Sequence, residues 1–321
     1  GLVTGVQTCA LPIYIGTYLI PRLVESGYEV ITVSRGLSDA YHPHRAWESV
    51  QKIVIDRTEA ERAGDFGRRI SSLKPDIVID LICFKLESAR QLVESLKGQV
   101  QHFLSAGTIW VHGHAVQVPA TEDQSRQPFG EYGIQKAKIE AYLLDEARRS
   151  GFPATILHPG HITGPGWICV NPAGNFDLQV FVKLARGEEV ALPNLGMETL
   201  HHVHADDVAQ GFIKAMQNWR GAVGENFHIV SPAAMTLRGL AEAVAAWFGQ
   251  PANLRFLPWE EWRTTVSEEQ YARSTWDHIA HSDSYSIEKA MRLIDYQPRY
   301  TTTEAVFECV SWLMEHGVIA I

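Results

Sequence analysis

The sequence predicts an α/β protein, built as a doubly wound parallel sheet followed by a smaller C-terminal α/β lobe. Short apolar runs with strand character alternate with segments of helical periodicity, a pattern typical of parallel sheets covered by helices on both faces. Right-handed crossovers bring the carboxyl ends of such strands to one edge of the sheet, where ligands bind. After residue 166 Pro, Gly and Asn cluster and the spacing of the elements changes, which indicates a second unit.

The individual elements follow from these periodicities. Strands are expected, in chain order, at 29–33, 52–55, 76–82, 102–105, 154–157 and 226–230. Helices are expected at 88–96, 135–149, 178–185, 208–216, 237–248, 285–294 and 302–315. The helix at 88–96 has the clearest signal, because Ala89, Leu92, Val93 and Leu96 recur at three- and four-residue steps.

Composition narrows the classes of partner. The 321 residues are 45 % hydrophobic and 20 % charged, with a formal net charge of −9. This acidic balance gives no electrostatic footprint for nucleic acid and disfavours an anionic membrane surface. The four cysteines lack paired or metal-ligand spacing, as is typical of a reduced chain. With no apolar run of about 18 residues and no signal-peptide pattern, we expect a cytoplasmic protein without a membrane or nucleic-acid partner.

The start of the chain does not look like an evolved segment. Thr4–Ile13 reads TGVQTCALPI, an in-frame translation of a sequence resembling a common short-read sequencing adapter, so we expect residues 1–13 to be an assembly artefact. From Tyr14 the chain reads like the second half of a dinucleotide-binding turn, with Gly16 as the last glycine of a G-x-x-G-x-x-G loop. The two earlier glycine positions hold Ala10 and Ile13. The first strand and most of the phosphate-binding turn are therefore expected to be missing or substituted.

A tyrosine and a lysine lie one helical turn apart in Tyr132-Gly-Ile-Gln-Lys136, and Thr108 follows an apolar strand upstream. Residues i and i+4 share a helix face, so the ammonium is expected to lower the phenol pKa from about 10. Such a phenol can exchange a proton with a substrate oxygen, to which Thr108 can hydrogen-bond. A lone Tyr-x-x-x-Lys is a weak signal, but its place after a strand ending in a hydroxyl residue makes Thr108, Tyr132 and Lys136 the predicted catalytic residues.

From Tyr14 to about Glu315 the chain resembles the extended or atypical short-chain dehydrogenase/reductases, the NAD-dependent epimerase/dehydratase family that includes UDP-glucose 4-epimerases. The matching motifs are Tyr14-Ile-Gly16, Asp56-Arg57, Thr108 with Val111-His-Gly113, Tyr132-x-x-x-Lys136, His158-Pro159 with Gly164-Pro-Gly166, Val203-His-Ala-Asp206-Asp207, and Ser286-Ile-Glu-Lys-Ala with Tyr296-Gln-Pro298. The resemblance implies a Rossmann-like dinucleotide-binding domain at 1–165. It also implies a substrate lobe at 166–321, with segments that return to the first domain.

The resemblance assigns roles to individual residues. Tyr132 would be the acid/base, Lys136 would bind the nicotinamide ribose, and Thr108 would orient the substrate oxygen. Cofactor contacts are expected from Gly16, Ser34, Arg35, Asp56, Arg57, Lys136 and Pro159. Substrate contacts are expected from His112, Asn171 and Asn175.

The second strand ends in Ser34-Arg35, where NAD-preferring relatives carry an acidic residue for the ribose hydroxyls. An arginine there can pair with a 2′-phosphate, so we expect NADP or NAD with NADP slightly favoured. An exposed loop arginine without a ligand is the alternative interpretation.

Relatives that dehydrate nucleotide sugars carry Asp-Glu directly after the threonine, whereas this chain has Ile109-Trp110, which cannot transfer protons. We therefore disfavour 4,6-dehydration and predict an NAD(P)-dependent oxidoreductase that epimerises a nucleotide sugar by transient oxidation. One alternative is an NADPH-dependent ketone or aldehyde reductase. Another is a non-catalytic nucleotide- or RNA-binding relative, like the chloroplast stem-loop-binding proteins. A homodimer is an expected assembly.

Three histidines and two aspartates cluster at 201–207 and invite a metal interpretation. An N-cap role for Asp206 or Asp207, at the start of the helix at 208–216, explains the same segment more simply. We therefore expect no metal site.

Overall fold

The computed structural model describes residues 2–6, 10–37 and 40–321, with side chains from residue 14 onward. Its main element is a seven-stranded sheet in the order β11-β6-β5-β4-β1-β2-β3, in which every neighbouring pair is parallel. The strands are β1 (Leu2–Val6), β2 (Glu29–Ser34), β3 (Gln51–Val54), β4 (Ile77–Asp80), β5 (His102–Ala106), β6 (Ala154–Pro159) and β11 (Asn226–Ile229). The order reverses between β1 and β4, which confirms the predicted doubly wound α/β sheet.

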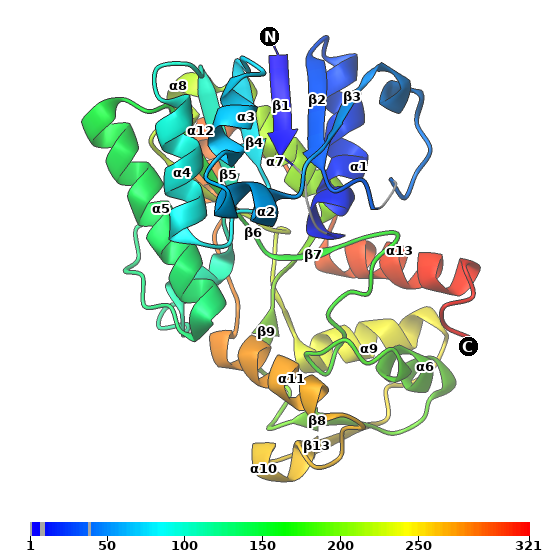
Figure 1. Cartoon of the computed structure of the whole chain (residues 1–321). Helices are drawn as coiled ribbons and strands as arrows, with labels where there is room; N and C mark the ends of the chain where they lie inside the picture. The colour runs from blue at the N-terminus through cyan, green and yellow to red at the C-terminus, as the bar shows by residue number, and fades with distance from the viewer. Residues whose placement is uncertain (1, 7–9, 38–39) are drawn as a thin grey trace.

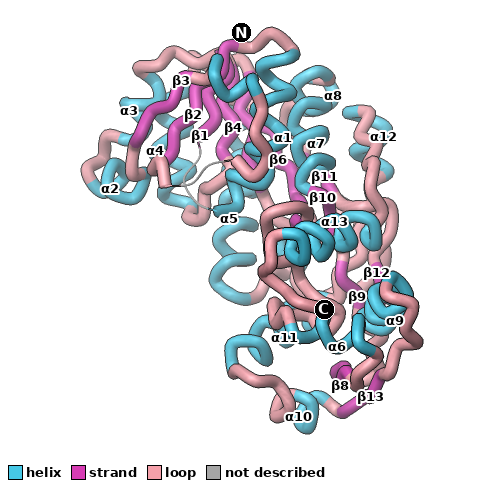
Figure 2. Tube along the Cα trace, turned by 90° about the vertical axis from the view of Figure 1, so that its right-hand side faces the viewer, coloured by secondary structure: helices cyan, strands magenta, loops and turns pink. Residues whose placement is uncertain are grey.

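Helices cover both faces of this sheet (Figure 2). One face carries α1 (Ala10–Glu25), α7 (Ala205–Gln217), α8 (Trp219–Ala222) and α12 (Glu288–Ile294). The other carries α2 (Arg57–Arg62), α3 (Phe66–Ser71), α4 (Leu86–Leu96) and α5 (Gly130–Ser150). Because strand side chains alternate between faces, Leu104 packs into the α1–α7 layer and its neighbour Phe103 into the α3–α5 layer.

The second unit lies below the sheet in Figure 1. Its elements are α6 (Gln179–Arg186), β8 (Val190–Pro193), β9 (Thr199–Leu200), β12 (Met235–Thr236), α9 (Leu237–Trp247), β13 (Leu254–Leu257), α10 (Trp259–Trp262), α11 (Glu269–His281) and α13 (Thr302–Glu315). A separate apolar core holds it together, with Phe181, Val244, Trp262 and Val310 among its buried members. Two short strands, β7 (His161–Thr163) and β10 (His202–His204), pair in parallel at the junction.

Segments from beyond residue 165 also complete the first unit. β11 pairs with β6 at the edge of the large sheet, and α7 packs against α1. In the described part of the chain, no helix combines the length and the apolarity needed to cross a membrane.

The central strand is present although the sequence led us to expect it missing or substituted. Leu2–Val6 forms β1, which pairs in parallel with β2 and β4. Helix α1 begins at Ala10, so Gly16 lies buried in its second turn and not at its start. The predicted G-x-x-G-x-x-G loop at positions 10–16 is instead part of α1, and the link from β1 to α1 at residues 7–9 lies outside the described residues. The adapter origin of residues 1–13 stays a prediction.

The predicted N-cap of α7 was wrong. The His204 Nδ1 atom accepts a hydrogen bond from the Asp206 backbone N–H at 3.0 Å, so the cap precedes both aspartates. The Asp207 carboxylate instead accepts from the backbone N–H groups of Arg299 and Tyr300, at 2.8 and 3.1 Å. This carboxylate therefore ties α7 to the segment before α13. The described residues contain no group of three or more His, Cys, Asp or Glu arranged to hold a metal ion.

Candidate functional site

A cavity of about 270 Å³ opens at the carboxyl edge of the large sheet, facing the second unit. The residues lining its first-unit side, here called the domain-side wall, include Ala106, Thr108, Tyr132, Lys136 and Pro159. Those lining the opposite side, here called the lobe-side wall, include His161, Val170, Phe176 and His278. The ends of β5 and β6 thus meet α5 and α11 around one space, as expected for a ligand site in an open parallel sheet.

Thr108 is fixed directly after the end of β5. Its backbone N–H donates to the His158 Nδ1 atom at 3.0 Å, and its hydroxyl oxygen accepts from the Trp110 N–H at 3.3 Å. Any other residue at position 107 would clash, because a Cβ added to Gly107 would lie 2.3 Å from His158 Nδ1. The His158 ring can therefore approach the strand end and hold Thr108 in place.

Tyr132 lies in the first turn of α5, which begins at Gly130, ahead of the predicted start at residue 135. Its side chain stays 39 % exposed at the cavity. Burial of the phenol raises the pKa of Tyr132, and a hydrogen bond with the Thr108 side chain opposes that rise without cancelling it. The expected lowering of this pKa by Lys136 was thus wrong, since desolvation outweighs the favourable contacts.

Lys136 is buried one turn further along the same face of α5. Its ammonium donates to the Ala106 carbonyl at 2.7 Å and lies 5.0 Å from the centre of the Phe84 ring. Burial lowers the pKa of Lys136 to about 8. The ammonium points at the strand end and lies 5.9 Å from the centre of the Tyr132 ring, which explains its weak effect on the phenol.

Glu140 continues the i, i+4 series of Tyr132 and Lys136, and the sequence analysis missed it. Its buried carboxylate accepts two hydrogen bonds from Arg126, at 2.9 and 2.7 Å, and one from His158 Nε2 at 3.1 Å. Burial raises the pKa of Glu140, but the interactions with His158 and Arg126 hold it well below its usual range. Because Nε2–H of His158 faces the carboxylate, Nδ1 is left as the acceptor for Thr108.

The predicted cofactor residues separate into two groups. Pro159 lines the cavity with Lys136, and Ser34 with the exposed Arg35 lies at the carboxyl end of β2, beside β1. The second group, Asp56 and Arg57, supports the fold.

Asp56 caps α2 by accepting from the Glu59 N–H at 3.1 Å. Arg57 is 5 % exposed and binds Asp80 through two hydrogen bonds, at 2.7 and 3.1 Å, and Glu61 at 2.5 Å. The Arg57 guanidinium is therefore committed to carboxylates of the protein, away from the cavity lining.

The nicotinamide end of a dinucleotide fits the domain-side wall. Ile15, Leu81 and Pro159 offer apolar surface, and the Ala106 carbonyl takes one of the three Lys136 N–H groups, which leaves donors for ribose hydroxyls. The first turn of α1 carries no acidic residue. No carboxylate there would repel a phosphate bound at the N-terminus of this helix. The pyrophosphate turn itself includes residues outside the described part of the chain.

The three predicted substrate residues do not line the cavity. His112 is buried, with its Nε2 atom 2.7 Å from Nε2 of His228, and burial lowers the pKa of His112 to about 3. Asn171 and Asn175 are also buried and join each other through a hydrogen bond of 2.6 Å that closes their loop. The Asn171 amide bonds within its loop, and the Asn175 amide nitrogen donates to the Thr275 hydroxyl of α11 at 3.0 Å. The neighbouring Val170 and Phe176 line the cavity instead.

The lobe-side wall contains polar residues that the sequence analysis did not select. His161 Nε2 lies 2.9 Å from the carboxylate of the buried Asp283, and the Trp110 indole N–H donates to the same oxygen at 3.3 Å. His278 binds the Gly174 carbonyl through Nδ1 at 2.8 Å. His278 and Asp283 lie close together around the end of α11, whereas Trp110 and His161 come from two distant segments, so no local spacing in the sequence relates all four.

Comparison with known proteins agrees with this geometry. Residues 2–229 match the model of the NAD dependent epimerase/dehydratase family. The chain is similar to 2'-dehydrokanamycin reductase of Streptomyces kanamyceticus, with 25 % identity over 312 residues, 94 % of this chain and 82 % of that protein. It is also similar to the chloroplast stem-loop binding protein of 41 kDa b of Arabidopsis thaliana, with 22 % identity over 313 residues, 91 % of this chain and 75 % of that protein.

Among solved structures, UDP-glucose 4-epimerase of Thermotoga maritima, determined with UDP-glucose, superimposes with a TM-score of 0.73. The superposition has 21 % sequence identity and covers 98 % of this chain and 99 % of the epimerase. The family match spans most of the chain and coincides with the sheet and with the grouping of Thr108, Tyr132 and Lys136. The chain therefore belongs to the NAD-dependent epimerase/dehydratase family of extended short-chain dehydrogenase/reductases.

Proposed function

We propose that the protein is an NAD(P)-dependent oxidoreductase that reduces a ketone of a carbohydrate-like small molecule to a secondary alcohol. The supporting observation is the convergence of Thr108, Tyr132 and Lys136 on the cavity that Pro159 also lines. A hydroxyl, a phenol and an ammonium around one space are the groups needed to orient a carbonyl, protonate its oxygen and bind a ribose.

The roles follow from chemistry and position. A bound nicotinamide cofactor supplies the hydride. The Thr108 hydroxyl donates a hydrogen bond to the carbonyl oxygen, and the Tyr132 hydroxyl gives that oxygen its proton. Because the pKa of Tyr132 is raised, the phenol is protonated near neutral pH, the form required for reduction.

Epimerisation of a nucleotide sugar, the first function predicted from the sequence, begins with oxidation and needs Tyr132 as a base. The raised pKa of Tyr132 disfavours that first step. Of the relatives reported above, one is named as a reductase, which supports the reductive direction. Ile109 and Trp110 provide no acid–base group at the cavity, which continues to disfavour dehydration.

RNA binding is a second candidate, because one of the relatives is named for stem-loop binding. The net charge of −9 argues against it, since affinity for a phosphate backbone depends on basic side chains. We propose NADP as the preferred cofactor, because Arg35 lies exposed beyond β2, where a 2′-phosphate is read in dinucleotide-binding folds.

The test is NADPH oxidation with a panel of keto sugars. Tyr132→Phe is expected to lower kcat by about 10²- to 10⁴-fold while the Kd for NADPH stays unchanged, because only the proton donor is lost. Tyr142→Phe is the matched control on α5, since the Tyr142 hydroxyl contacts Glu94 on the outer side of the helix. Full activity of the Tyr132→Phe enzyme would refute the proposed acid. Interconversion of UDP-glucose and UDP-galactose without net NADPH oxidation would favour the epimerase.

A further inference from the structure

The cavity contains little positive charge. Among the described residues that line it, Lys136 is the only lysine or arginine, and its ammonium is turned towards Ala106 on the domain-side wall. Burial lowers the pKa of both His161 and His278 to about 3, so the lobe-side wall is uncharged at neutral pH. A phosphorylated substrate would find no cationic side chain there to bind its oxygens.

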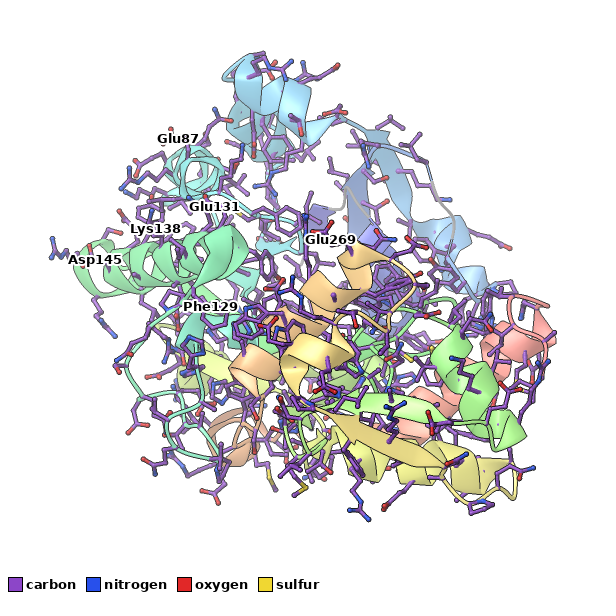
Figure 3. The ribbon with its side chains drawn as sticks, turned by 90° about the horizontal axis from the view of Figure 1, so that it is seen from below. Glu87, Phe129, Glu131, Lys138, Asp145 and Glu269 are labelled. Atoms are coloured by element: carbon purple, nitrogen blue, oxygen red, sulfur yellow. The ribbon has the colours of Figure 1, made fainter. Side chains whose placement is uncertain are left out.

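Carboxylates also occupy the N-termini of helices near the cavity. The Asp177 carboxylate accepts a hydrogen bond of 2.9 Å from the Gln179 N–H at the start of α6. Helix α5 carries Glu131 in its first turn, next to Tyr132, as Figure 3 shows from below. A helix N-terminus attracts phosphate through free N–H groups and a positive dipole end, and carboxylates at that position weaken the attraction.

A buried carboxylate lies directly behind the lobe-side wall. Asp283 is 0 % exposed and accepts from His161 at 2.9 Å, from the Trp110 indole at 3.3 Å and from the Tyr285 hydroxyl at 2.8 Å. Within the described part of the chain, these hydrogen-bond partners are all neutral donors, so no protein cation is paired with the carboxylate. Burial raises the pKa of Asp283, and a cation bound in the cavity would favour the charged form of this carboxylate.

The two histidines of the wall offer hydrogen-bond acceptors. His161 gives its Nε2–H to Asp283, which leaves the lone pair on Nδ1. His278 gives its Nδ1–H to the carbonyls of Gly174 and Ser274, at 2.8 and 2.7 Å, which leaves the lone pair on Nε2. Both imidazoles line the cavity, so they suit a ligand rich in N–H and O–H donors.

Aromatic rings complete the surroundings. Phe84, Tyr132 and Phe176 line the cavity and are each between 37 and 39 % exposed, and Trp110 lies beside them. Exposed aromatic faces attract ammonium groups and exclude compact, strongly hydrated anions. The net charge of −9 also attracts cations and repels anions over longer distances.

We propose that the substrate is an unphosphorylated carbohydrate or cyclitol that carries at least one ammonium group. His161 and His278 accept hydrogen bonds from it, and Asp283 supplies the compensating negative charge. This inference rests on the proposed function, in that it takes the cavity to be the substrate site, and it departs from the nucleotide sugar expected from the sequence.

The experiment measures binding to the full chain loaded with NADP⁺, so it does not depend on turnover. Three probes are compared by calorimetry: the β-1,4-linked dimer of glucosamine, cellobiose and UDP-glucose. The first two differ only in an ammonium or a hydroxyl at each C2. We expect the glucosamine dimer to bind about tenfold or more tightly than the other two, as desolvated cation–π and charge contacts allow.

Asp283→Asn keeps the shape and removes the charge, and it should reduce this preference to near unity. Asp277→Asn is the control, because Asp277 is an exposed residue of α11, the helix that ends just before Asp283, and it lines a different pocket. Tighter binding of UDP-glucose, equal binding of all three probes, or no binding of any would overturn the inference. So would an unchanged preference in folded Asp283→Asn protein. Selective binding without keto-sugar reduction would instead refute the proposed function and leave the substrate class standing.

Discussion

The domain-side and lobe-side walls of the cavity are built in different ways. The domain-side wall takes its chemistry from one helix face and one strand end, where Tyr132, Lys136 and Glu140 follow each other at four-residue steps. The lobe-side wall takes its chemistry from residues such as His161 and His278, which are far apart in sequence and fixed mainly by other groups of the fold.

Under the proposed function, this difference would separate catalytic residues from residues that select the substrate. The domain-side wall presents the same few groups that any carbonyl reduction needs, and its geometry follows from helix and strand periodicity. The lobe-side wall decides which molecule is presented to them. Substitutions on the first wall are therefore expected to change kcat, and substitutions on the second to change KM and substrate preference.

The largest effect is expected from Glu140→Gln, which breaks the buried network under the domain-side wall. Loss of the carboxylate leaves the partly buried Arg126 and the buried His158 without their charged partner, and the free energy of unfolding should fall by about 3–5 kcal/mol. Asp145→Asn makes the same chemical change on the outer side of α5 (Figure 3), where the pair with Arg149 is exposed, and should change the free energy of unfolding by about 0–1 kcal/mol. Urea denaturation measures the free energy of unfolding of both variants. Equal losses of stability would show that the buried network does not stabilise the fold.

The stability difference between the wild type and Glu140→Gln should depend on pH. Because the folded-state pKa of Glu140 is depressed, its contribution to stability is present above the unfolded-state pKa of about 4.3 and is lost as pH falls below it. The stability difference between the wild type and Glu140→Gln should therefore narrow in acid. A difference that stays constant down to pH 3 would contradict this assignment.

An intermediate effect is expected from the titration of Lys136. The pKa of Lys136 is about 8 and that of Tyr132 is raised, so kcat/KM for ketone reduction should fall about tenfold per pH unit above pH 8. Lys136→Arg, which stays charged over this range, should move the decline to higher pH even if its activity is lower. A wild-type profile that is flat to pH 9.5 would show that the Lys136 charge is not required.

The smallest effect is expected at Arg35, outside both walls. Arg35→Ala should weaken NADP binding about tenfold and leave NAD binding unchanged. The reason is that NADP carries the 2′-phosphate with which the guanidinium would pair, and NAD does not. Arg45→Ala, in the short helical segment that follows the same loop, is the control. The ratio of the two dissociation constants, measured by fluorescence titration, is the readout. An unchanged ratio would remove the structural basis for preferring NADP.

Local pattern was sufficient for much of the fold. The helix at 302–315 is found with the bounds Thr302–Glu315, and the strand end before Thr108 lies beside the Tyr132–Lys136 face, as the spacing indicated. The expected substrate residues lie away from the cavity lining for one physical reason. Asn171, Asn175 and His112 have polar side chains suited to ligand contact, but nearby buried groups already satisfy their hydrogen bonds.

The sequence by itself determined the doubly wound sheet and the grouping of Thr108, Tyr132 and Lys136 at one cavity, because both depend on periodicities of two and 3.6 residues and on short spacings that a single chain displays. Only the tertiary structure decided the direction of the Tyr132 pKa shift, the commitment of Arg57 to Asp80, and the uncharged wall of His161 and His278. Those properties depend on burial and on contacts between distant segments. Desolvation and long-range hydrogen bonding arise only when the chain has folded.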